Sequence, residues 1–295
     1  MGAMTAAHAN RNRLAVVFAL TVGVLVIELA GGIWTNSLAL LADAGHVFTD
    51  VIGIGLALVA IWFAGRPATS GRTYGFVRLE ILAALVNAML LLGIAAYILV
   101  EAWRRLQAQP EIISGPMLVI ALIGGAANAL GIWLLHDAQR TSLNMRGAYL
   151  EVVGDLLGSV AVVVAAVVIL VTGWTQADAI ASIAIAVLIM PRTWRLLRDA
   201  VDILLEATPK GLRIDDVRAH ILGAKGVADV HDLHAWTITS GMNVLSAHVV
   251  IEPDADPPAV LDELCRCLAG DFDIEHSTFQ LETADRRRLE EVGHA

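Results

Sequence analysis

Long apolar runs separated by short polar breaks organise the first two thirds of the chain. A transmembrane helix needs about 20 mainly apolar residues to cross roughly 30 Å of hydrocarbon. Six segments meet this requirement: residues 14–34, 38–64, 79–103, 115–136, 147–172 and 177–204. The pattern predicts an all-α transmembrane bundle of six helices over residues 14–208, preceded by an N-terminal tail of residues 1–13.

After Pro209 the pattern changes to shorter elements that are typical of a soluble domain. Two stretches have helical spacing and three alternate like strands: residues 212–222 and 258–268, and residues 227–239, 244–252 and 274–282. Residues 240–243 fit the turn of a hairpin between the first two strands. The order αββαβ predicts a small α+β domain over residues 209–295, with helices on one face of a three-stranded sheet.

Composition supports the membrane assignment and argues against some partners. Hydrophobic residues make up 57% of the chain and charged residues 17%, and the mean hydropathy is +0.68. Soluble domains have roughly 45–50% apolar and about 25% charged residues. The net charge of −9 gives no indication of nucleic-acid binding, which usually needs a basic patch or stripe. Two cysteines, Cys265 and Cys267, make no disulfide framework and fit a reducing cytoplasm.

Positive charges in short loops predict the orientation, because Lys and Arg accumulate on the cytoplasmic side of a membrane. With the N-terminus inside, four groups of arginines lie on that side: residues 11–13, 66–78, 140–146 and 192–198. Only Arg104 and Arg105 lie at an outer end. We therefore expect a multi-pass protein of the cell membrane with both termini in the cytoplasm.

Two of the expected spans carry pairs of ionisable side chains, which are costly in lipid and therefore indicate function. His46 and Asp50 are four residues apart in the second span, and Glu151 and Asp155 are four apart in the fifth. Each pair therefore shares one helix face. If the two spans face each other, one imidazole and three carboxylates meet. Four ligands of these types suit a tetrahedral zinc ion.

The alternative for these acids is an ion pair with a basic side chain in a neighbouring span, but we place no Lys or Arg deep in another span. A glycine follows the second residue of each pair by three positions, at Gly53 and Gly158. We expect these glycines to let the helices approach closely. Asp43 is either an outer-shell or proton-relay residue or a polar packing residue. Four other polar residues of the spans are isolated and are expected to form interhelical hydrogen bonds: Glu28, Asn87, Asn128 and Asp178.

Four stretches resemble the cation diffusion facilitator family, and most of all its bacterial cobalt–zinc–cadmium resistance subgroup. They are LADAGHVFTD at 41–50, RTYGFVRLE at 72–80, SLNMRGAYLEVVGDLLGS at 142–159 and VHDLHAW at 230–236. The resemblance covers nearly the whole chain in order. It implies a homodimeric metal/proton antiporter of the inner cell membrane, with six helices and a ferredoxin-like, metallochaperone-like cytoplasmic domain.

The resemblance also implies the ligands of the transported ion, Zn²⁺: His46, Asp50, Glu151 and Asp155. Many zinc transporters of the family carry histidine at the position of Glu151, whereas the resistance subgroup carries glutamate. A carboxylate makes the site harder and more anionic than an imidazole does. This widens the expected selectivity toward Co²⁺ and Cd²⁺, with Mn²⁺ or Fe²⁺ as an alternative.

Two further features follow from the resemblance. Arg78 and Glu206 match a charge interlock between the inner ends of the third and sixth spans, the alternative being two unrelated surface charges. In the cytoplasmic domain one set of residues matches the ligands of a regulatory zinc ion: His231, His248, His276 and Glu282. His234 and Asp232 lie beside this set, with His234 a possible outer-shell residue. The alternative is that these are ordinary exposed residues on strands.

The expected function is Zn²⁺/H⁺ antiport by alternating access, because metal ligands must be deprotonated to bind and metal binding therefore releases protons. An enzyme is not expected, since the sequence has no His-Glu-x-x-His motif and four protein ligands leave zinc no open position. No organic cofactor is expected. A membrane-anchored metal sensor remains an alternative, although a sensor would not require the buried acids.

Overall fold

The computed structural model describes residues 2–137, 139 and 143–287. The chain divides into two compact units, one comprising Met1–Ala57 and Val86–Leu197 and the other Leu58–Leu85 and Arg198–Ala295. The expected loop around residue 140 falls partly outside the described residues, as do residues 288–295 of the expected cytoplasmic domain.

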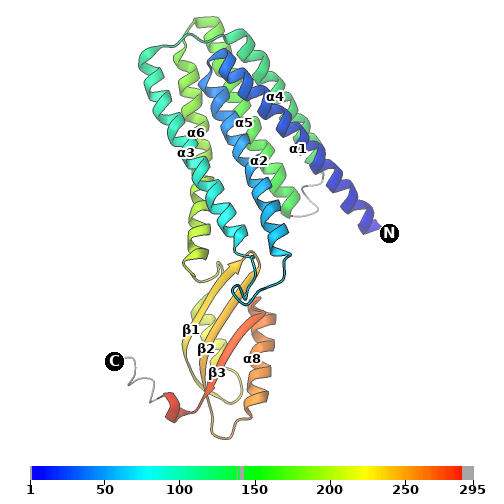
Figure 1. The fold of residues 1–295 in the computed structure, drawn as a ribbon, viewed down its shortest axis with the longest axis vertical. Helices are drawn as coiled ribbons and strands as arrows, with labels where there is room; N and C mark the ends of the chain where they lie inside the picture. The colour runs from blue at the N-terminus through cyan, green and yellow to red at the C-terminus, as the bar shows by residue number, and fades with distance from the viewer. Residues whose placement is uncertain (1, 138, 140–142, 288–295) are drawn as a thin grey trace. The chain divides into compact units, whose positions relative to one another are not determined.

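The six expected transmembrane helices are all present (Figure 1). They are α1 (Gly2–Thr35), α2 (Leu38–Ala64), α3 (Leu79–Ala108), α4 (Ser114–Leu135), α5 (Leu143–Thr172) and α6 (Gln176–Leu204). Each contains a segment long and apolar enough to cross a membrane. The boundaries agree with the sequence pattern within a few residues, except that residues 2–13 continue α1 as a helix.

Small side chains fill the centre of the helical unit. Its largest buried cluster is rich in alanine, including Ala39, Ala102, Ala121 and Ala166. Small residues let helices pack closely in lipid, where no hydrophobic driving force acts between them. Large apolar residues such as Trp133 are exposed and suit contact with lipid.

The start of α2 is held by Asp178 of α6. The buried carboxylate accepts hydrogen bonds from Ser37 Oγ at 2.6 Å, from the amide of Leu38 at 2.8 Å and from the amide of Ala39 at 3.1 Å. Amides in the first turn of a helix have no partner within the helix. The expected interhelical hydrogen bonding of Asp178 is confirmed, and it anchors the helix that carries His46.

The C-terminal elements follow the predicted order αββαβ. They are α7 (Ile214–Leu222), β1 (Val227–Thr239), β2 (Met242–Ile251), α8 (Pro257–Phe272) and β3 (His276–Glu282). β1 pairs antiparallel with β2, and β2 pairs parallel with β3. Figure 1 shows α8 beside this sheet.

Alternation along β2 decides which side chains face the core of this small domain. Leu245 and Val249 are fully buried in one apolar cluster with Leu264 of α8 and Ile221 of α7. Because neighbouring residues of a strand point to opposite faces, His248 points to the other face of the sheet. The helices therefore cover one face and leave the histidines on the other.

We expect Asp178→Ala to lower the thermal unfolding temperature of the full-length protein in detergent. Three buried donors would lose their acceptor, and each unsatisfied buried group costs about 1–3 kcal/mol. The control is Asp202→Ala, which removes only an exposed ion pair with Arg198 and should leave the temperature almost unchanged. Equal unfolding temperatures for the two variants would contradict the anchoring role.

Candidate metal centres

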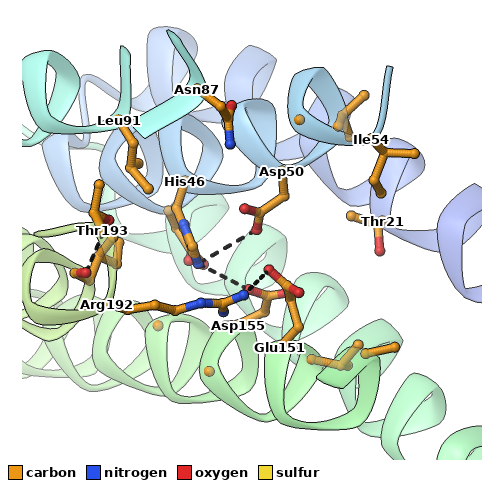
Figure 2. Close-up of a pocket in the computed structure, with 18 of the residues that line it drawn as sticks. Thr21, His46, Asp50, Ile54, Asn87, Leu91, Glu151, Asp155, Arg192 and Thr193 are labelled. Atoms are coloured by element: carbon orange, nitrogen blue, oxygen red, sulfur yellow. Dashed lines mark hydrogen bonds and ion pairs between the residues drawn. The ribbon is translucent and has the colours of Figure 1, made fainter. Parts of the chain in front are cut away.

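Three side chains converge between α2 and α5 (Figure 2). Nε2 of His46 lies 3.6 Å from Oδ2 of Asp50 and 3.5 Å from Oδ1 of Asp155. We call these three residues the triad, and each offers a ligand atom within 4.8 Å of the others. A tetrahedral zinc site with metal–ligand distances of about 2.0–2.1 Å has ligand–ligand edges of roughly 3.4 Å. The two distances from Nε2 of His46 therefore match two edges of such a site.

Few hydrogen bonds from other residues reach the triad. Asp155 is only 4% exposed, and apart from the 3.5 Å contact with His46 its Oδ1 atom has no hydrogen-bond partner among the described residues. Buried polar atoms are normally hydrogen-bonded, and a buried anion without a partner is costly. A cation bound between the triad atoms would satisfy this oxygen.

A cavity of about 380 Å³ surrounds the triad. Its lining reaches Asp43 in one direction and Thr193 and Leu196 of α6 in the other. The cavity therefore extends from the triad toward the C-terminal end of α6, with room for an ion and water.

Glu151 lines the same cavity but is paired with a cation. Nη2 of Arg192, on α6, lies 2.8 Å from Oε1 of Glu151 (Figure 2). The expectation that no basic side chain reaches the acids was wrong. Arg192 was assigned to a cytoplasmic cluster by the distribution of positive charge, yet it lies well inside α6. The sequence could have predicted a basic side chain within the sixth span, because the apolar run of 177–204 already includes Arg192.

Gly53 and Gly158, which follow Asp50 and Asp155 by three residues, make room for polar side chains of neighbouring helices. A Cβ atom on Gly53 would lie 2.8 Å from Nδ2 of Asn87, and one on Gly158 would collide with Oδ1 of Asp43. The close approach expected at these glycines is thus an approach of side chains.

A second group of candidate ligands lies on the helix-free face of the sheet. His231 and His248 are directly opposite in the register of β1 and β2. The carboxylate of Glu282 lies between them, 3.2 Å from Nε2 of His231 and 2.9 Å from Nδ1 of His248. These three residues also offer ligand atoms within 4.8 Å of one another.

Asp232 is a fourth candidate that was not assigned as a ligand. Its Oδ2 lies 3.6 Å from Nδ1 of His231 and 4.0 Å from Nδ1 of His248. Asp232 has a φ of 46°, in the left-handed region that Asp tolerates better than most residues. It lies in an irregularity of the β1–β2 register between His231 and His234. A bulge of this kind re-aims side chains, so simple alternation could not reveal this neighbour.

His276 does not join the group, contrary to expectation. The parallel register places His276 opposite Val244 and Gln280 opposite His248. His276 is therefore four residues from the required position, about 13 Å along a strand. His234 lines a hollow beside His248 but is not among the three residues whose ligand atoms lie together.

The two cysteines lie on α8 and are free. The thiol of Cys267 donates to the carbonyl of Leu264, and Ser277 donates to Sγ of Cys265. Burial raises the pKa of the Cys267 thiol, which disfavours the thiolate form that binds metal. Both contacts fit a packing role.

Two contacts lie near the N-terminal end of α3. Nη2 of Arg78 is 3.0 Å from Oε1 of Glu206, so the residues of the expected charge interlock form an ion pair. Glu80 accepts hydrogen bonds from Thr239 at 2.7 Å and Ser240 at 2.8 Å. This role of Glu80 was not predicted, although the residue lies in the family-like motif of residues 72–80.

Two family descriptions match consecutive parts of the chain. Residues 14–205 match the cation efflux transmembrane domain, and residues 209–284 match the cytoplasmic domain of cation efflux proteins. The chain belongs to the cation diffusion facilitator family. It is therefore a multi-pass membrane protein that transports cations and is not an enzyme, with a cytoplasmic C-terminal domain.

Three relatives of this cation diffusion facilitator have informative names. The metal cation efflux system protein CzcD of Cupriavidus metallidurans is 44% identical, over 97% of this chain and 90% of its own. The cadmium, cobalt and zinc/H⁺-K⁺ antiporter of Bacillus velezensis is 39% identical, over 95% of this chain and 90% of its own. The zinc transporter ZitB of Escherichia coli is 42% identical, over 92% of this chain and 88% of its own. The resemblance seen in the sequence motifs is thus confirmed.

We expect His248→Ala to weaken zinc binding at the cytoplasmic cluster by more than about tenfold, since loss of even a supporting residue costs 10–100-fold in metal affinity. The measurement is a zinc titration of the full-length protein carrying Asp50→Ala, which silences the triad. His276→Ala in the same background is the control and should bind as the parent does. A weaker affinity for the His276 variant alone would contradict the assignment of the cluster.

Proposed function

We propose that this protein exports Zn²⁺, and also Co²⁺ and Cd²⁺, from the cytoplasm in exchange for protons. The triad binds the ion with Glu151 as the fourth ligand, and the site is exposed alternately to the two sides of the membrane. The observation that carries the proposal is the spacing of the triad, in which one imidazole nitrogen lies 3.5 and 3.6 Å from two carboxylate oxygens. The names of the relatives support these ions and the exchange for protons.

Exchange follows from the chemistry of the ligands. Imidazole and carboxylate groups bind metal only when deprotonated, so metal entry and protonation oppose each other. An imidazole normally changes charge between pH 5 and 8, and clustered carboxylates titrate as a set. An outside more acidic than the cytoplasm therefore favours release outward, which drives efflux.

Arg192 competes with the metal ion for Glu151. In the empty site the guanidinium of Arg192 holds Glu151 in an ion pair. Glu151 therefore has to leave Arg192 before it can act as the fourth ligand of the ion.

The cytoplasmic domain adds control by the concentration of metal in the cytoplasm. His231, His248 and Glu282, with Asp232, form a zinc site of ordinary ligand types. We place the protein in the inner cell membrane as a homodimer, for which the match to the cytoplasmic domain of cation efflux proteins is the support. A pure sensor would have no use for the cavity around the triad.

We expect Asp50→Ala to abolish zinc uptake into vesicles that contain a zinc-sensitive dye and an imposed pH gradient. The variant loses one corner of the site, while its position at the cavity leaves the packing of the bundle intact. Asp202→Ala is the control and should transport as the unaltered protein does. Transport by Asp50→Ala at the unaltered rate, with the protein monodisperse, would contradict the site.

We expect Arg192→Met to tighten zinc binding at the triad by up to about fivefold, because the partly exposed ion pair that opposes the fourth ligand is worth about 0.2–1 kcal/mol. The control is Arg195→Met on the same helix, whose guanidinium contacts only the carbonyl of Pro191 among the described contacts. Zinc titration of both proteins, each with His248→Ala to silence the cytoplasmic cluster, measures the effect. Weaker binding by Arg192→Met would show that the guanidinium does not compete with the metal.

A further inference from the structure

Two acidic side chains outside the triad are buried next to each other. Glu28 of α1 is 1% exposed and Asp43 of α2 is 2% exposed, and their carboxyl groups interact. We call them the acid pair. Apart from this interaction, neither oxygen of Glu28 has a hydrogen-bond partner among the described residues. Glu28 was expected to form an interhelical hydrogen bond, and the packing of α1 brings it to Asp43 of α2.

Four helices build the surroundings of the acid pair. Oδ2 of Asp43 accepts a hydrogen bond from Ser159 of α5 at 3.4 Å, and the Ser159 hydroxyl accepts one from Asn128 of α4 at 3.2 Å. A Cβ atom on Gly124 of α4 would lie 2.5 Å from Oε1 of Glu28. The missing side chain at Gly124 therefore leaves the space that the Glu28 carboxyl group occupies.

No cation faces the acid pair in the described part of the chain. The charged groups that act on Glu28 are Asp43 and Asp155, and Gly124 and Asn128 of α4, which lie beside the pair, carry no charge. An ionised carboxylate without a partner is very costly to bury, whereas the neutral acid is not. Two adjacent carboxyl groups also resist ionising together. The acid pair therefore needs a bound proton in this state.

The acid pair communicates with the metal site without belonging to it. Asp43 lines the cavity that surrounds the triad, so water in that cavity can deliver or remove a proton. Asp43 also precedes His46 by three residues and lies one turn away on α2. The charge of Asp155 acts on Glu28, so a metal ion at Asp155 repels a proton on the pair.

We propose that Glu28 and Asp43 bind a proton that is exchanged for the metal ion. This rests on the proposed function and adds a proton site outside the metal ligands, whose own protonation also opposes metal binding. When Zn²⁺ enters the triad from the cytoplasm, an O–H bond of the acid pair breaks and the proton passes to cavity water. When the ion leaves outward, a hydronium ion returns a proton to a carboxylate oxygen of the pair.

The test uses the full-length protein in vesicles, with a zinc dye and a pH dye inside. The variants Glu28→Gln and Asp43→Asn keep the size of the neutral acids, and each removes one of the two carboxyl groups that hold the proton. Both should still carry zinc down its own gradient. A pH gradient of one unit changes zinc accumulation about tenfold for each proton exchanged. Its effect should be smaller on both variants than on the unaltered protein, and zinc entry should release fewer protons. Glu28→Asp should restore part of the coupling.

Controls separate this proposal from the proposed function. Asp50→Ala should carry no zinc with or without a pH gradient, and Asp202→Asn should couple zinc to protons as the unaltered protein does. Should Glu28→Gln fail to fold, Asp43→Asn alone gives the same comparison. Full coupling in both variants would overturn the acid pair and leave the triad as the proton site. Zinc flux of the unaltered protein that ignores the pH gradient would overturn the antiport itself, and the acid pair with it.

Discussion

An acidic side chain inside a membrane has to be neutralised, and this requirement shapes the helical bundle. The acids of this protein meet it in different ways. Asp178 receives the amides that begin α2, and Glu151 takes the guanidinium of Arg192. We propose a proton for the acid pair of Glu28 and Asp43 and a metal ion for the triad. A proton and a metal ion can be exchanged with the solvent, whereas the amides and the guanidinium belong to the protein.

The cytoplasmic domain connects its candidate metal site to a transmembrane helix through one strand. β1 carries His231 near its start and ends at Thr239, which donates a hydrogen bond to Glu80 on α3. Two residues before Glu80, Arg78 pairs with Glu206 just after α6. The candidate ligands His231 and Asp232 therefore lie on the same strand whose end contacts Glu80.

The sequence was sufficient for features that depend on local periodicity. Apolar runs predicted the helices, and the spacing of four residues predicted which acids share a helix face. Features that depend on strand register or on helix packing could not be predicted from the sequence. Arg192 was misplaced because a charge near a helix end and one inside the span look alike in sequence. The position of His276 depends on the parallel register of β3, and that of Asp232 on a bulge. The contact of Glu28 with Asp43 depends on how α1 packs.

Empty volume is as much a part of this protein's chemistry as its ionisable groups. Gly124 and Gly158 contribute no functional atom, yet the carboxyl groups of Glu28 and Asp43 occupy the space that a side chain at either position would fill. A single added methyl group there displaces an acid without altering any charge. A survey of inactivating substitutions that looked only for lost ionisable residues would overlook these positions, although the geometry of the carrier depends on them.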